Sequence, residues 1–371
     1  MPENFHIDMP EAVRNIIHTI EEHGFKAYAV GGCIRDSILG RNPDDWDITT
    51  SAVPSQIKTF FKRTVDTGIA HGTVTIMIDK TGYEVTTYRI DGEYEDGRHP
   101  KSVEFSDRLV DDLCRRDFTI NAMAYNDTDG FVDEFKGLDD LDTKIIRCVG
   151  EPELRFTEDA LRMMRAIRFS AQLGFTIDEA TWNAIKKLSP SISKISMERV
   201  HVELGKTLMS AHPDYVAQYS EAGLFAPILP VIDNALKSRY KRKILATLQH
   251  TPDNIYLRYA ALFITSTPDE AAKTLRALKL DNKTVNTVSK LVELSKMDIE
   301  ETEPAVRTAL NKYGRDFLTL WHELMMAVIQ ASEDITGISN PAKVKHLLTL
   351  KRLGTCLLYT SPSPRDRSLS R

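Results

Sequence analysis

Two aspartates separated by a single residue, Asp45 and Asp47, are the side chains of this chain best suited to hold a metal ion. They flank Trp46 in DDWDITT, a run whose β-branched residues predict a strand. Side chains two positions apart on a strand point to the same face, so we expect the carboxylates side by side and Trp46 turned into a core. Two such charges repel unless a hard cation lies between them, and Mg²⁺ is commonly held by one or two carboxylates together with substrate phosphates. Glu84, on the later strand-like run YEVTTYRI, is a candidate third carboxylate.

A glycine pair, Gly31 and Gly32, precedes these acids in VGGCIRDSILG. Glycine lets the backbone approach a phosphate closely, and the free N–H groups at the start of the following helix attract an anion, with Arg35 one turn further on. By itself a glycine pair is usually a turn, and an acidic cluster is usually a solvated loop. The two features together, at this spacing, favour a site that binds a triphosphate and a metal ion.

A second constellation follows in RRDFTINAMAY, where Arg116, Asp117 and Asn121 stand at the start of an apolar segment. Apolar residues such as Phe118 can anchor this segment and present the polar side chains to a ligand. An ordinary surface ion pair on a core helix is the alternative interpretation.

A third constellation is EDALRMMRAIRF, whose periodicity predicts a helix that carries Asp159 and Arg162 as neighbours one turn apart. An acceptor beside a donor suits the Watson–Crick edges of cytosine and adenine, which show an exocyclic amine next to a ring nitrogen. A plain intrahelical salt bridge of about 0.2 to 0.5 kcal/mol is the alternative. Arg165 and Arg168 continue at steps of three and are candidates to contact the triphosphate or the RNA backbone.

The elements that must position these motifs change in character along the chain. The first 147 residues alternate short helices with strand-like runs, which predicts an α+β module with a mostly antiparallel sheet, whereas long helical segments dominate from about residue 148. Four widely spaced cysteines exclude a dense disulfide framework and a cysteine-based zinc site. No run of about 18 apolar residues and no basic leader is present, so we expect a cytoplasmic protein that does not bind membranes. The net charge of −5 gives no general nucleic-acid signal.

Taken together, GGCIRDSILGRNPDDWDITT, RRDFTINAMAY and EDALRMMRAIRF resemble the motifs of the class II CCA-adding tRNA nucleotidyltransferases and of their poly(A) polymerase relatives. Both belong to the superfamily that includes DNA polymerase β. The resemblance runs from about residue 10 to about residue 350 and is strongest over the first 210 residues. A poly(A) polymerase and a non-catalytic RNA-binding relative remain open as alternatives.

The resemblance implies a polymerase β-like catalytic head over residues 1–147, an all-helical neck over 148–210 that recognises the base, and a helical body over 211–355 that binds tRNA. It further implies that C, C and A are added to the tRNA 3′ end from CTP and ATP, with Mg²⁺ as cofactor and the protein as template, and that the acceptor stem is bound. The oligomeric state stays open. From the residues and the resemblance together, we expect catalysis at Asp45, Asp47 and Glu84, metal binding at Asp45 and Asp47, and nucleotide binding at Gly32, Arg35, Arg116, Asn121, Asp159, Arg162, Arg165 and Arg168.

Four further segments carry expectations. The stretch RIDGEYEDGRHPKSVEF, residues 89–105, is rich in Gly, Asp and Glu and predicts a flexible loop, for which the resemblance implies a role in the final A addition. The basic segments Lys237–Lys243 and Pro341–Gly354 are candidate contacts for tRNA phosphates. Residues 356–371 resemble a translated sequencing adapter, and a disordered Ser/Pro tail is the alternative.

Overall fold

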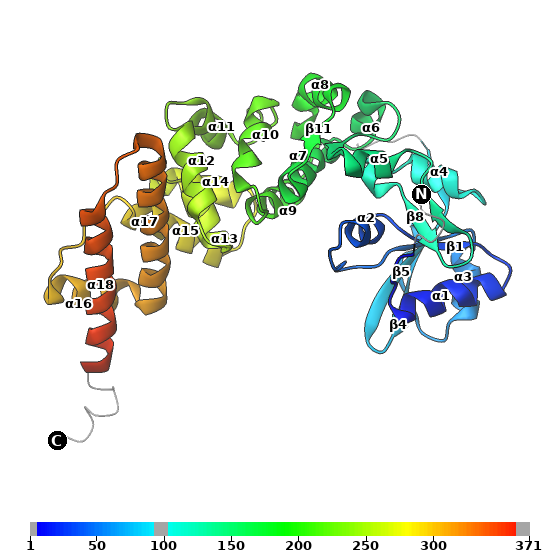
Figure 1. Ribbon diagram of the computed structural model, residues 1–371, viewed down its shortest axis with the longest axis horizontal. Coiled ribbons are helices and arrows are strands. Elements are labelled where there is room, and N and C mark those ends of the chain that lie inside the picture. The colour runs from blue at the N-terminus through cyan, green and yellow to red at the C-terminus, as the bar shows by residue number, and fades with distance from the viewer. Residues whose placement is uncertain (1–5, 93–102, 361–371) are drawn as a thin grey trace, which may run out of the picture. The chain divides into compact units, whose positions relative to one another are not determined.

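The computed structural model of the chain describes residues 6–92 and 103–360 (Figure 1). Its contacts divide the chain into two compact units, the first formed by residues up to Ser170 together with Gly174–Ile195, and the second by Ala171–Leu173 together with the residues from Ser196 onward. The expected head and most of the expected neck therefore lie in the first unit, and the expected body lies in the second. Most of the loop expected over 89–105 and most of the expected adapter-like tail fall outside the described residues.

A seven-stranded sheet forms the centre of the first unit. Its strand order is β3-β4-β5-β2-β1-β8-β9, with β1 (Ala27–Val30), β2 (Ile48–Thr50), β3 (Thr64–Gly68), β4 (Thr73–Ile78), β5 (Thr81–Thr87), β8 (Ala124–Asn126) and β9 (Gly130–Val132). All neighbours pair antiparallel except β2 and β5, which run parallel. The prediction of a mixed, mostly antiparallel sheet is confirmed. A separate hairpin joins β6 (Arg89–Asp91) to β7 (Val103–Phe105).

Helices make up much of the rest of the first unit. They are α1 (Glu11–Glu22), α2 (Gly32–Ile38), α3 (Pro54–Phe60), α4 (Leu109–Cys114), α5 (Gly137–Asp142), α6 (Pro152–Glu158), α7 (Leu161–Leu173) and α8 (Glu179–Leu188), with a 3-10 turn η2 at Thr119–Asn121. Of these, α1 to α4 contact the sheet. The apolar face of α1 shows why it packs here, since Val13, Ile16, Ile17 and Ile20 recur at helical spacing and are all buried. The neck is not purely helical as expected, because β10 (Ile145–Ile146) pairs in parallel with β11 (Thr176–Ile177).

The described part of the second unit consists of helices without strands. They are α9 (Met197–Leu208), α10 (Ala217–Glu221), α11 (Pro230–Lys237), α12 (Lys241–His250), α13 (Ile255–Leu262), α14 (Pro268–Ala277), α15 (Asn282–Leu294), α16 (Glu303–Tyr313), α17 (Arg315–Thr336) and α18 (Pro341–Thr360). Local capping sets several starts; at α14, for example, Thr267 and Glu270 form a reciprocal capping box. Within residues 6–92 and 103–360, no helix has both the length and the apolar character that crossing a bilayer requires.

Candidate nucleotide and metal site

The three predicted carboxylates lie at neighbouring positions next to the central sheet. Strand β2 begins only at Ile48, so Asp45 and Asp47 precede the strand, although the backbone N–H of Val30 donates to the backbone oxygen of Asp47 at 3.0 Å and extends the β1–β2 pairing by one residue. Ile48 pairs with Val85 in the parallel β2–β5 ladder. The residues that precede this pair, Asp47 and Glu84, are therefore brought next to each other on adjacent strands.

The segment that carries the two aspartates differs from the expectation in one respect. Trp46, which stands between them, is half-buried rather than part of the buried core, so its expected core packing is only partly realised. Asp45 and Trp46 precede β2, whereas Asp47 continues the β1–β2 pairing through its backbone oxygen. Asp45 and Asp47 both remain exposed.

The charges of these acids are not balanced by the protein. Loss of hydration raises the pKa of Asp47 even though part of its surface stays exposed, the positive charge of Arg116 acts in the opposite direction, and the charge of Asp45 raises the pKa further. The pKa of Glu84 is also raised, first by burial and then by the charges of Asp47 and Asp45. The three carboxylates therefore repel one another, which is the electrostatic situation that a bound cation relieves.

A hard divalent cation fits this donor set, although the protein alone does not complete its coordination. Within the part of the chain that the structure describes, no three acidic, histidine or cysteine side chains converge closely enough to hold an ion by themselves. Asp45 and Asp47 offer two hard oxygen ligands with uncompensated charge. Such a pair is sufficient where the remaining ligands are water and the phosphates of a substrate.

The glycine turn lies beside these acids and approaches an arginine. Gly31 has a positive φ of 86°, and a Cβ atom built there would lie 2.7 Å from the Nη1 atom of Arg116, so a side chain at this position would collide with the guanidinium. Arg116 also donates to the buried carboxylate of Asp112 at 3.3 Å. Arg116 therefore adds positive charge beside this turn, where the seven-residue helix α2 begins.

Arg35 is held differently from the expectation that it reaches a triphosphate. Its side chain is buried and donates to the carboxylate of Asp36 at 2.9 and 2.8 Å and to Oδ1 of Asn121 at 2.6 Å. Asn121 in turn donates from Nδ2 to Asp117 at 3.1 Å. In this structure Arg35 therefore orders Asn121 through a buried hydrogen-bond chain.

Asp117 connects this chain to helix α7. One carboxylate oxygen accepts from Nε and Nη2 of Arg165 at 2.7 and 2.6 Å, and the other accepts from Asn121 and from the backbone N–H of Phe118. Burial alone would raise the pKa of Asp117, but the charge of Arg165 and these hydrogen bonds hold it well below its usual range. The acid of the RRDF motif thus fixes the position of an arginine that the sequence assigned to nucleotide binding.

Phe169 gathers the predicted arginines around one aromatic ring. The guanidinium carbons of Arg168, Arg35 and Arg165 lie 3.7, 5.0 and 5.4 Å from the centroid of its ring, within the range of cation–π attraction. Phe118 meets the same ring edge-on at 5.8 Å. Sequence reasoning missed Phe169, and the signal that could have found it is an aromatic residue directly after the last arginine of RMMRAIRF.

The expectation that Asp159 and Arg162 lie one turn apart on a single helix is wrong. Helix α6 ends at Glu158 and α7 begins at Leu161, and Asp159 between them is extended, with φ −143° and ψ 104°. Its carboxylate accepts from the backbone N–H of Leu161 at 3.0 Å. Aspartate favours such helix starts over helix interiors because its short side chain reaches free N–H groups.

Arg162 is also committed to protein partners in this structure. It pairs with the carboxylate of Glu158 and donates to the backbone oxygens of Arg155 and Arg115 at 3.1 and 3.0 Å. The ion pair at this place is therefore Glu158–Arg162, at a spacing of four residues. Arg162 and Asp159 thus both bond to protein groups, Arg162 to Glu158 and two backbone oxygens and Asp159 to the N–H of Leu161.

Part of the first basic segment is already neutralised. Lys237 pairs with Asp233 and Lys241 pairs with Glu221, each at 2.8 Å. The guanidinium of Arg239 lies 4.9 Å from the ring centroid of Tyr240. The second segment forms most of α18.

Comparison with known proteins identifies the family of this chain. Residues 27–147 match the family described as Poly A polymerase head domain, and residues 174–236 match the one described as Probable RNA and SrmB-binding site of polymerase A. A CCA-adding enzyme of Streptococcus suis is 38% identical over 359 residues, which cover 94% of this chain and 84% of that protein. The chain belongs to the CCA-adding enzyme family.

Other members of the CCA-adding enzyme family give the same result over different lengths. The CCA-adding enzyme of Limosilactobacillus reuteri is 49% identical over 230 residues, which cover 61% of this chain, and the chain spans only about half of that relative, 56% of its length. The crystal structure of the Bacillus stearothermophilus CCA-adding enzyme in complex with CTP superposes with a TM-score of 0.72 at 33% identity, covering 94% of this chain and 82% of the other. The expected polymerase-type head and helical body are confirmed by this match.

Proposed function

We propose that this chain adds C, C and A to the 3′ end of tRNA from CTP and ATP. The observation that carries the proposal is the group of three mutually repelling carboxylates, Asp45, Asp47 and Glu84, next to the glycine turn and Arg116. Membership of the CCA-adding enzyme family supports it, as does the fold shared with a relative that was solved with CTP. The tRNA acceptor stem and the second nucleotide, ATP, are part of the same proposal.

The reaction joins the 3′ oxygen of the RNA to the α-phosphorus of the nucleotide. The bond from that phosphorus to pyrophosphate breaks, the hydroxyl gives up its proton, and pyrophosphate leaves. Nucleotidyltransferases are generally metal-dependent, and we infer that Asp45 and Asp47 hold Mg²⁺, which when bound makes the hydroxyl more acidic and stabilises charge on the phosphates. Glu84 serves as a third carboxylate beside them.

The other proposed residues bind and orient the nucleotide. Arg116, beside Gly31 and Gly32, supplies positive charge where the backbone can approach the triphosphate. Asn121 faces the ribose with its amide fixed by Arg35 and Asp117. Pre-organised donors of this kind lower the barrier because they need not reorient during the reaction.

Base selection requires a rearrangement of the present contacts. We infer that Asp159 and Arg162 read the amine and the ring nitrogen shared by cytosine and adenine. To do so, Asp159 gives up its hydrogen bond from the N–H of Leu161, and Arg162 gives up its ion pair with Glu158. Both side chains then contact the edge of the base. Arg165 and Arg168, held by Asp117 and Phe169, are proposed to position the triphosphate.

A second candidate function is poly(A) polymerase activity, which is favoured by the match of residues 27–147 to the Poly A polymerase head domain. The third possibility, a non-catalytic RNA-binding relative, is disfavoured because Asp45 and Asp47 are both present and lie beside Glu84.

One assay separates these functions. The purified chain is incubated with Mg²⁺ and a tRNA that ends just before CCA, with labelled CTP alone, ATP alone, or both. We expect C incorporation with CTP alone, none with ATP alone, and a completed CCA end with both, whereas a poly(A) polymerase extends the RNA with ATP alone. Loss of all incorporation while the tRNA still binds would identify the non-catalytic relative. The Asp47→Asn variant is the matched negative control.

A further inference from the structure

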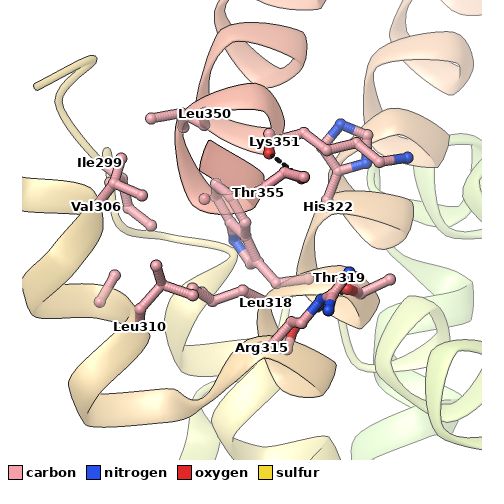
Figure 2. A pocket seen from close by; sticks show the side chains of 13 residues that line it. Ile299, Val306, Leu310, Arg315, Leu318, Thr319, His322, Leu350, Lys351 and Thr355 are labelled. Carbon is pink, nitrogen blue, oxygen red and sulfur yellow. Dashed lines mark hydrogen bonds between the residues drawn. The ribbon is translucent and has the colours of Figure 1, made fainter. Parts of the chain in front are cut away.

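A cavity of about 240 Å³ lies within the second unit, lined by residues of α16, α17 and α18 and by the segment before α16 (Figure 2). Its lining is mainly apolar and includes Val306, Leu318, Trp321 and Leu350, which are buried or half-buried. Figure 2 shows Val306 and Leu310 on one side of this space and His322 with Lys351 on the other. A dry cavity of about 150 Å³ already accepts a benzene ring, so this one has room for a ring with substituents.

His322 places an unsatisfied polar atom in this lining. The side chain is only 8% exposed, and its Nε2 atom has no hydrogen-bond partner among the described residues. Burial, followed by the nearby charge of Lys351, lowers the pKa of His322, while a hydrogen bond with the backbone of Leu347 acts in the opposite direction. A neutral imidazole has one N–H donor and one acceptor nitrogen, and with the proton on Nδ1 the unpartnered Nε2 is the acceptor.

The other polar groups of the lining do not supply the missing donor. The indole N–H of Trp321 donates to the backbone oxygen of Leu294 at 3.2 Å. The hydroxyls of Thr319 and Thr355 donate along their own helices, to the backbone oxygens of Arg315 at 3.1 Å and Lys351 at 3.0 Å. A buried acceptor without a donor is unfavourable, so a ligand that donates to His322 gains affinity at this point.

The charged residues of the lining all carry the same sign. Arg315 and Lys351 are exposed at its edge, and no acidic residue is among the residues that line the cavity. Neither cation forms an ion pair with a residue in the described part of the chain. An anionic group on a ligand would therefore meet two cations that have no protein counter-charge.

We propose that this cavity binds an aromatic carboxylic acid that carries a hydroxyl group. The ring lies against Trp321 and Leu318, the hydroxyl donates to Nε2 of His322, and the carboxylate meets Arg315 or Lys351. This site lies within the second unit and does not depend on the proposed nucleotidyl transfer.

Three matched probes test the proposal by calorimetric titration of the full chain at pH 7. We expect 3-(4-hydroxyphenyl)propionate to bind at one site per chain. 3-Phenylpropionate, which lacks the hydroxyl, and 4-ethylphenol, which lacks the carboxylate, should each bind at least tenfold more weakly. Absence of saturable binding of all three probes, or equal affinity for them, overturns the proposal.

Variants place the binding in this cavity. A Cβ atom at Gly354 would lie 3.9 Å from Cγ1 of Val306, an ordinary contact, so Gly354→Ala narrows the cavity without disturbing the fold and should weaken binding at least fivefold. Arg315→Gln combined with Lys351→Gln should remove the preference for the acid over 4-ethylphenol. Lys345→Gln, an exposed position of α18 outside the lining, is the control and should leave all affinities unchanged. Unchanged binding in Gly354→Ala, or an equal loss in Lys345→Gln, rules out this site.

Discussion

Two sets of carboxylates in the first unit differ in how their charge is balanced. Asp112 and Asp117 are buried and accept hydrogen bonds from arginines, and in both the paired arginines outweigh burial and lower the pKa. Asp47 and Glu84 keep exposed surface, and their pKa values are raised by lost hydration and by neighbouring acids. The first set is neutralised by the protein itself and fixes side chains in place. The second set is left with excess negative charge that Arg116 offsets only in part and that a bound cation would compensate.

The largest effect that sharpens this comparison is expected from Asp47→Asn. Removing this charge takes away one of two proposed metal ligands, so nucleotide incorporation should fall on the order of 10³-fold. Because the substitution also relieves repulsion, the thermal midpoint should stay the same or rise slightly. Incorporation assays and thermal unfolding followed by circular dichroism measure the two quantities. Asp44→Asn, an exposed neighbour, is the matched control, and an equal loss of activity there would contradict the assignment.

Asp117→Asn tests the neutralised set and should act mainly on stability. The variant leaves Arg165 without its charged partner, and we expect a loss of about 2 to 3 kcal/mol at pH 7, near the lower end for a broken buried pair because Arg165 is partly exposed. Since the folded-state pKa of Asp117 is lowered, its stabilisation is fully present above the unfolded pKa of about 3.9 and is lost as the pH falls through the folded-state pKa.

Urea unfolding of both proteins at several pH values measures this difference. The gap between the parent chain and Asp117→Asn should be widest near neutral pH and should narrow as the pH falls below about 4. Asp36→Asn is an informative comparison, because Asp36 also pairs with an arginine but keeps more exposed surface. A gap that stays constant down to acidic pH would show that Asp117 acts through its shape rather than its charge.

Phe169, like Asp117, is proposed to hold arginines in position and not to take part in the reaction itself. Phe169→Leu keeps an apolar side chain but removes the ring that faces Arg35, Arg165 and Arg168. Cation–π contacts and the lost ring volume together are expected to cost about 1 to 2 kcal/mol of stability and to raise the nucleotide KM about tenfold. Unfolding experiments and initial rates at varied CTP concentration provide the readouts. A changed kcat with an unchanged KM would contradict a role in positioning the arginines.

Much of the first unit could be predicted from the sequence because its signals are local. The strand periodicity predicts that Asp45 and Asp47 point to one face, and the β-branched runs predict the sheet that carries Glu84. The parallel adjacency of β2 and β5 is a non-local pairing, so the sequence pattern alone does not reveal it. Motif spacing therefore located the candidate metal site without giving its geometry.

The partners of the arginines were less predictable, because they too lie far away in the sequence. Arg165 binds Asp117, which is 48 positions away, and Arg35 binds Asn121, 86 positions away. Local spacing also misassigned Asp159, because the tendency of aspartate to bond free N–H groups at a helix start outweighed the helical periodicity around it. Charged residues that seem available in a linear motif are often bound by partners that only the fold supplies.

The smallest effect is expected at Glu84, and it decides whether Glu84 is a metal ligand equal to Asp45 and Asp47. Glu84→Gln removes one repelling charge, so stability should rise by about 0.5 kcal/mol, as is usual for an exposed charge. If Asp45 and Asp47 hold the ion and Glu84 only adds to the local negative field, incorporation should fall about tenfold, far less than in Asp47→Asn. Titrating Mg²⁺ in the assay separates the two cases, because loss of a direct ligand raises the concentration required for half-maximal activity much more than loss of a neighbouring charge. If Glu84→Gln raises the Mg²⁺ concentration for half-maximal activity as much as Asp47→Asn does, Glu84 is a direct ligand and all three acids have the same role.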